Sequence, residues 1–126
     1  MKYEEFVTRV AEHGGVPEAE AGTLASATLA TLAERISGGE ALDLAAQIPA
    51  PLDSALVTDR ENAEAFGFAE FVERTAERAG TDVDTAERAV DAVFVTLREA
   101  VTPGEFDDVL SQLPADLQRL GTSQPQ

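Results

Sequence analysis

The chain has 126 residues, no cysteine and a formal net charge of −15, from 24 acidic and 9 basic side chains. The absence of cysteine excludes disulfides, thiolate metal sites and thiol catalysis. Because so acidic a surface repels phosphate backbones and anionic lipids, the charge argues against nucleic-acid and membrane partners and favours basic ones. Adaptation to a high-salt cytoplasm and a GC-rich genome are both consistent with this acidity, and the sequence leaves that choice open.

Length and hydropathy indicate one globular domain, 1–126. The apolar content of 44% is too high for a disordered chain. The N-terminal segment carries acids early and lacks a long apolar run, so we expect no signal peptide there. No stretch approaches 18 consecutive apolar residues, and we therefore predict a cytoplasmic protein that does not contact the membrane.

An internal repeat organises the sequence. A shift of 65 residues aligns residues 6–52 with 71–117 without a gap, and 18 of these 47 pairs are identical. We therefore predict repeat one at 3–57, a polar linker at 58–67, repeat two at 68–120 and a frayed tail at 121–126.

The first predicted helix of each repeat carries its apolar residues on one face. In repeat one they occur at positions i, i+3, i+4, i+7 and i+8 between residues 3 and 11. The matching positions of repeat two lie between 68 and 76. Glycine is common directly after the last residue of a helix. We therefore predict that Gly14 and Gly15, and Gly80 in repeat two, end these helices.

The second predicted helix is the longest, with apolar stripes from 21 to 36 and from 86 to 101. Pro17 suits the first helical position, because no intrahelical N–H is needed there. In repeat two, Thr81 and Asp84 have the spacing of a capping box, which would start the helix instead.

The third predicted helix has the clearest start. Ser37 with Glu40, and Thr102 with Glu105, form two capping boxes 65 residues apart. In such a box the hydroxyl accepts an N–H of the first turn, and the glutamate reaches back to the N–H of the cap residue. We therefore predict third helices that begin directly after residues 37 and 102.

Each repeat closes with a short fourth turn. Pro49 and Pro114 end the third helix, and Leu52 and Leu117 are predicted to pack that turn onto the core. No segment alternates with a period of two residues, so no sheet is expected. The predicted fold is all-α: a six-helix bundle from two tandem three-helix repeats with pseudo-two-fold symmetry. One shared core is expected, because a half of about 50–60 residues is marginal alone.

Several segments carry a family resemblance. The stretches 32–41 (LAERISGGEA) and 97–105 (LREAVTPGE), with the Gln-x-Pro stops inside 44–52 and 109–117, resemble a prokaryotic domain-of-unknown-function family, number 2267. The similarity covers about residues 3–120. The resemblance implies a small, intracellular, helical protein, and it supplies no catalytic residues to carry over.

Two pairs of carboxylates are the main candidates for chemistry. Glu40 and Asp43, and likewise Glu105 and Asp108, lie three residues apart on one face of a predicted helix. That spacing suits a hard cation or a division of acid and base roles. Acids in the first turn of a helix are also what the macrodipole and the capping box favour, and we prefer this structural interpretation.

The other polar motifs are better explained by structure. The single histidine, His13, is expected to cap the C-terminal end of the first helix, and alone it cannot make a zinc site. The glycine pairs at 14–15 and 38–39 follow no strand and precede no Lys-Ser, which excludes a P-loop. Gly22, inside the second helix, indicates a close approach or a cost of about 1 kcal/mol in helix propensity. No serine lies in a Gly-x-Ser-x-Gly elbow.

We therefore assign no catalytic, cofactor-binding or metal-binding residue from the sequence. The favoured function is a non-enzymatic helical module for protein interaction or regulation, with an unknown protein partner or a second copy as ligand. The alternative is a carboxylate-based enzyme, or a protein that binds a cation or another ligand. A contiguous exposed apolar groove would favour the first function, and a buried carboxylate cluster with a raised pKa would favour the second.

Overall fold

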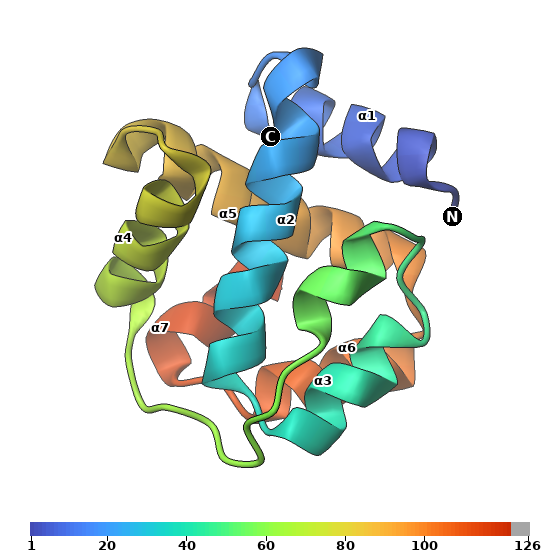
Figure 1. The fold of residues 1–126 in the computed structure, drawn as a ribbon, viewed down its shortest axis with the longest axis vertical. Coiled ribbons are helices and arrows are strands. Elements are labelled where there is room, and N and C mark those ends of the chain that lie inside the picture. The colour runs from blue at the N-terminus through green and yellow to red at the C-terminus, as the bar shows by residue number, and fades with distance from the viewer. Residues whose placement is uncertain (122–126) are drawn as a thin grey trace.

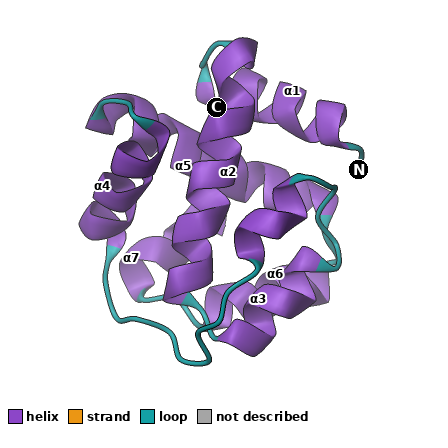
Figure 2. Cartoon of the chain, in the orientation of Figure 1, coloured by secondary structure: helices purple, strands orange, loops and turns teal. Residues whose placement is uncertain are grey.

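The computed structural model describes residues 1–121, and all of its regular elements there are helices (Figures 1 and 2). The predicted all-α class is confirmed. Within the described part of the chain there are seven α-helices and two 3₁₀ helices, where the sequence predicted six helices. No helix in residues 1–121 is long and apolar enough to cross a membrane. The elements are α1 (Tyr3–Gly14), α2 (Glu18–Arg35), α3 (Gly38–Ala45), η1 (Leu52–Leu56), α4 (Phe68–Ala79), α5 (Val83–Ala100), α6 (Pro103–Ser111), α7 (Ala115–Gln118) and η2 (Arg119–Gly121).

Helices in the first half (residues 3–57) match helices in the second half (residues 68–120). Both α1 and α4 have 12 residues, both α2 and α5 have 18, and each pair starts 65 residues apart. The halves end differently, with η1 alone in the first and α7 followed by η2 in the second. Leu52 and Leu117 are buried on these final turns, as predicted. The predicted tail lies outside the described residues except for Gly121, which ends η2.

Helices from the two halves pack against each other. The first helix of each half lies on the second helix of the other half: α1 contacts α5, and α4 contacts α2. Helices α3 and α6 also meet, and α2 crosses in front of α5 in Figure 1. One continuous core results, in which Phe6, Phe71 and Phe94 are fully buried. The rings of Phe71 and Phe94 meet edge to face, with 6.1 Å between centroids.

Glycine ends the first helix of each half. Gly15 and Gly80 follow α1 and α4 with φ values of 62° and 68°, in the left-handed region that glycine adopts without strain. Gly14 serves packing instead, because a Cβ there would lie 3.1 Å from the Ala92 side chain on α5. The predicted glycine stops are therefore found, and one of the glycines also sets how closely α1 approaches α5.

The two predicted starts of the second helices are wrong in detail. Pro17 is the cap residue, and α2 begins one position later. Thr81 and Asp84 form no capping box, because α5 is capped by Asp82, whose carboxylate accepts the N–H of Thr85 at 2.7 Å. An aspartate is at least as good a cap as threonine, so the chain begins α5 one residue later than the threonine would allow.

The predicted linker, 58–67, is mostly exposed but is attached to the rest of the protein at a few points. Its backbone bonds to the ends of α2 and α3: Glu61 accepts the N–H of Gly38 at 3.1 Å, and Glu64 donates to the carbonyl of Glu34 at 2.8 Å. Phe66 is buried, and the guanidinium of Arg74 lies 4.0 Å from the centroid of its ring. Side-chain burial and backbone bonds thus hold a segment that the sequence described only as polar.

Candidate functional site

Hydroxyl caps start the two third helices, as predicted. Ser37 Oγ accepts the N–H of Glu40 at 3.2 Å at the start of α3. Thr102 Oγ1 accepts the N–H of Glu105 at 3.3 Å at the start of α6. This half of each capping box is confirmed, and it places the two glutamates in the first turn of their helices.

The other half of each capping box is wrong, because glutamine replaces glutamate. The N–H of Ser37 donates to Gln112 Oε1 at 2.7 Å, and the N–H of Thr102 donates to Gln47 Oε1 at 2.8 Å. Each glutamine belongs to the Gln-x-Pro stop of the opposite half. With the cap N–H groups satisfied across the halves, the glutamate side chains are released to point elsewhere.

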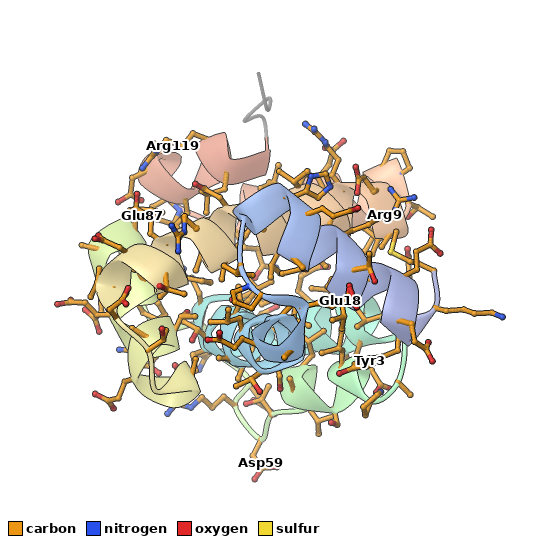
Figure 3. The ribbon with its side chains drawn as sticks, turned by 90° about the horizontal axis from the view of Figure 1, so that it is seen from above. Tyr3, Arg9, Glu18, Asp59, Glu87 and Arg119 are labelled. Carbon is orange, nitrogen blue, oxygen red and sulfur yellow. The ribbon has the colours of Figure 1, made fainter. Side chains whose placement is uncertain are left out.

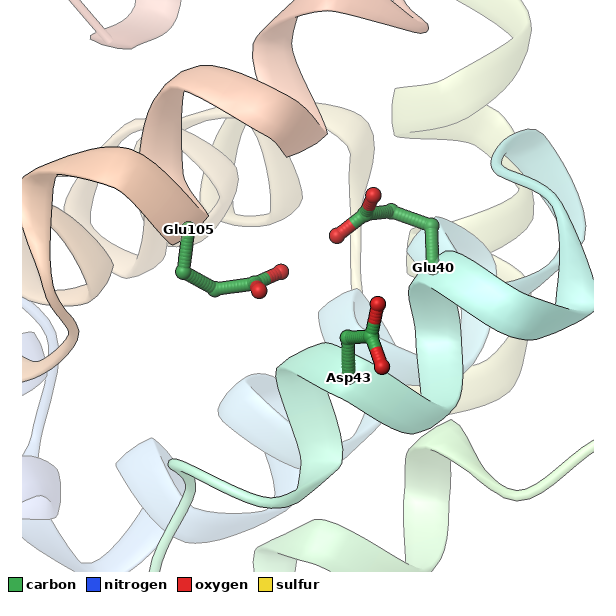
Figure 4. A group of neighbouring side chains, drawn as sticks. All are labelled: Glu40, Asp43 and Glu105. Carbon is green, nitrogen blue, oxygen red and sulfur yellow. The ribbon is translucent and has the colours of Figure 1, made fainter.

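Those glutamates converge between α3 and α6. Ligand oxygens of Glu40, Asp43 and Glu105 all lie within 4.8 Å of one another, as Figure 4 shows. One carboxylate oxygen of Glu40 and one of Glu105 are buried without a hydrogen-bond partner in the described residues. Asp43 is exposed, so the cluster opens to solvent on its side.

The electrostatics of this cluster favour a proton or a cation. Burial is the largest cause that raises the pKa of Glu105, and with the adjoining carboxyl group of Glu40 and the charges of Asp43 and Asp108 it brings that pKa to about 8. Two carboxyl groups in contact cannot both ionise without repulsion, so one holds a proton near neutral pH. A positive ion at the same place would remove the repulsion equally well.

The chemical range of the cluster follows from its oxygen-only donor set. Carboxylate oxygens suit hard cations such as Ca²⁺, Mg²⁺ and Mn²⁺, with water completing the coordination. The sequence paired Glu40 with Asp43 and Glu105 with Asp108, one pair to each helix. The structure instead joins Glu40 and Asp43 to Glu105, while Asp108 acts on Glu105 through its charge. The sequence signal for this meeting was that Glu40 and Glu105 occupy matching positions in the two repeats.

His13 lies at the C-terminal end of the first helix and also contacts the other half. It lies in the last turn of α1 as predicted, and its Nε2 lies 3.2 Å from Glu99 Oε1 on α5. Arg9 bonds the same oxygen at 3.2 Å. In the second half, two arginines at the matching positions bond Glu34 of α2. His13 therefore takes part in the contact between halves, and it is not part of the carboxylate cluster.

A groove along α2 went unrecognised in the sequence. Two adjoining hollows of about 540 and 420 Å³ share Tyr3, Gly22 and Thr23 as lining residues. Ser26, one of the serines without a catalytic motif, lines the larger hollow. The signal was present in residues 21–33, a run of 13 without a charged side chain. Helical periodicity assigned only its apolar members, and the small exposed ones were left without a role.

Comparisons with known proteins identify the family of this chain. No curated protein matches this chain. The family described as "Uncharacterized conserved protein (DUF2267)" matches it over residues 3–120, nearly its whole length. This match agrees with the resemblance carried by the two third helices and their Gln-x-Pro stops. The chain belongs to the DUF2267 family.

Proposed function

We propose that the protein is a non-enzymatic regulatory module that binds a divalent cation at Glu40, Asp43 and Glu105. The observation that carries this proposal is the convergence of the three carboxylates, two of which have a buried oxygen without a partner. A buried acceptor left unsatisfied costs about 1–3 kcal/mol, and more when it is charged. A cation between α3 and α6 would satisfy both oxygens and offset the repulsion.

Proton and cation compete for this site in the proposal. The raised pKa of Glu105 means that a cation displaces a proton from it at neutral pH. Affinity should therefore rise as the pH approaches and passes about 8. The exposed carboxylate of Asp43 supplies the side from which the ion enters and at which water completes its coordination.

We also propose that a pseudo-two-fold axis relates the two repeats. Equal helix lengths at a constant offset, the crossed contacts of α1 with α5 and α4 with α2, and the exchanged glutamine bonds support a pseudo-two-fold arrangement. Glu40 and Glu105 occupy matching positions, so the proposed axis passes between them. A cation there would link the two halves, which suits a regulatory role. The cytoplasmic location stays a prediction.

Denaturant unfolding with and without millimolar Ca²⁺, Mg²⁺ or Mn²⁺ tests the cation site. At a pH above 8, at least one of these ions should stabilise the parent protein by RT ln(1 + [cation]/Kd). Glu40→Gln and Glu105→Gln should remove that stabilisation. Asp107→Asn is the matched control, since it removes one exposed carboxylate from α6 outside the cluster. If all four proteins respond equally to each ion, general screening explains the effect and the site is wrong.

Protein interaction, the function that the sequence favoured, is the second candidate. A specific observation supports it: the groove along α2, whose lining between residues 21 and 33 carries no charge. Interface centres are depleted of charged residues relative to the rest of a protein surface. The groove and the carboxylate cluster share no residue, so the two candidate functions can be tested separately.

A further inference from the structure

We propose that the groove along α2 is a docking site for a basic amphipathic helix of another protein. This inference rests on the interaction function and gives it a surface and a class of partner. The groove runs between α1, α2 and η1, and α2 faces the viewer in Figure 1. Over Glu18 to Ala30 it follows α2 for about 18 Å, enough for three turns of a partner helix.

The floor of the groove is made of small side chains. Gly22, Ser26 and Ala30 follow one another at four-residue intervals on the same face of α2. Small residues let a second helix approach closely. Tyr3 forms one wall, and it needs the glycine, because a Cβ at position 22 would lie 2.7 Å from the tyrosine hydroxyl.

The matching face of α5 is built differently. At the positions of Gly22 and Ser26, the second half carries Glu87 and Asp91. The aromatic ring that corresponds to Tyr3 is already covered, since the Arg119 guanidinium lies 4.7 Å from the centroid of the Phe68 ring. The second half thus places charged side chains at these two positions of its second helix, while the first half has uncharged, small ones there.

Charge determines which partner fits. Glu4 and Glu18 lie at one end of the groove, and Figure 3 shows Glu18 and Tyr3 on the same side of the molecule. Arg78, at the other end, is held by Glu34 at 2.7 Å. A second copy of a chain with a net charge of −15 would be repelled. Lysine or arginine beside an apolar stripe would meet the acids and the half-buried tyrosine ring.

The test uses a synthetic Lys/Leu peptide of about 18 residues, with leucines at i, i+3 and i+4. Fluorescence anisotropy measures its binding to the protein at physiological salt. The parent protein should bind it, and a Glu/Leu peptide of the same pattern should not bind. Ser26→Arg, in the groove, should weaken binding by about ten-fold or more, because it adds bulk and like charge. Thr23→Arg, a second exposed groove position, should do the same.

Ser111→Arg is the matched control, because it makes the same substitution at an exposed position on α6. The affinity of this variant for the peptide should stay within about two-fold of the parent's, because the substitution changes only the general charge of the protein. If Ser26→Arg and Ser111→Arg weaken binding equally, the groove is not the docking site. The same holds if neither Ser26→Arg nor Thr23→Arg changes the affinity. Either result would leave the interaction function standing. Parent protein that binds neither peptide overturns the groove as a site for a basic helix. Self-association of the parent that Ser26→Arg abolishes would replace the basic helix with a second copy.

Discussion

At the residue scale, the central feature is that glutamine takes over a role usually played by glutamate. The cap N–H groups of α3 and α6 are accepted by Gln112 and Gln47 from the opposite half. Glu40 and Glu105, freed from the caps, meet each other at a partly buried point. The exchange of one hydrogen-bond acceptor for another therefore creates the candidate site.

The pH dependence of stability should show whether Glu40 and Glu105 hold a proton between them in the folded protein. The pKa of Glu105 is raised from 4.5 to about 8 in the folded protein, so the folded state binds a proton that the unfolded chain releases. Its stabilising contribution is fully present below pH 4.5 and is lost as the pH rises through about 8. We expect the free energy of unfolding, measured in urea, to fall across this window in the parent protein and to fall less in Glu105→Gln.

Asp107→Asn should behave like the parent in this measurement, because Asp107 is exposed and outside the cluster. Lowered pKa values, such as those of Glu34 and Asp82, act in the opposite direction and at lower pH, as stability is lost when the pH falls through them. Parallel profiles for parent and Glu105→Gln between pH 5 and pH 8 would show that the pair holds no shared proton.

At the element scale, each third helix is held at its start by the end of the other. Gln112 accepts from the backbone of Ser37 and also donates to its hydroxyl at 3.3 Å. Gln47 makes the corresponding pair of bonds with Thr102. Each glutamine side chain therefore bonds both the backbone N–H and the hydroxyl of a cap residue. These bonds couple the start of α3 and the start of α6 to the opposite half.

A double-mutant cycle measures this coupling. Ser37→Ala and Gln112→Ala should each lower the free energy of unfolding by about 1 kcal/mol, because the first leaves the N–H of Glu40, and the second the N–H of Ser37, without its acceptor. The double variant should lose less than the sum, since the two side chains bond each other. Thr102→Ala with Gln112→Ala is the control pair and should be additive. Additivity in both pairs would mean that the glutamine and the cap act independently.

At the scale of the whole molecule, the crossed packing makes each half depend on the other. Helix α1 packs on α5 as well as on α2 of its own half, and α4 packs on α2 as well as on α5. Phe6 and Val10, fully buried in the protein, belong to a core shared by both halves. A half that is cut away would expose this surface to water.

Separate halves should therefore not fold. A fragment of residues 1–57 and one of residues 58–126 should each show little helix by circular dichroism, because a chain this short buries too little apolar surface. Mixed in equal amounts, they should regain helix and unfold cooperatively. A fragment that unfolds cooperatively by itself would show that its core is its own and not shared.

Salt should stabilise the whole protein. With a net charge of −15, repulsion between acids opposes the compact state, and salt screens it. The ion pairs are partly exposed and individually weak, so their screening should cost less than the repulsion relieves. We expect Tm to rise between low and roughly molar salt. A flat or falling Tm would remove support for adaptation to a high-salt cytoplasm.

The sequence by itself determined which segments are helical, where most of them begin and end, and which faces are apolar. Helical spacing, the hydroxyl caps at Ser37 and Thr102 and the glycines at 15 and 80 act within about one turn, so sequence spacing records them. Periodicity says that a face is buried, but it does not say against which helix. The meeting of residues 40 and 105 depends on contacts between helices far apart in the chain. Only the packing of those helices decided this meeting, the exchanged glutamines and the open groove along α2.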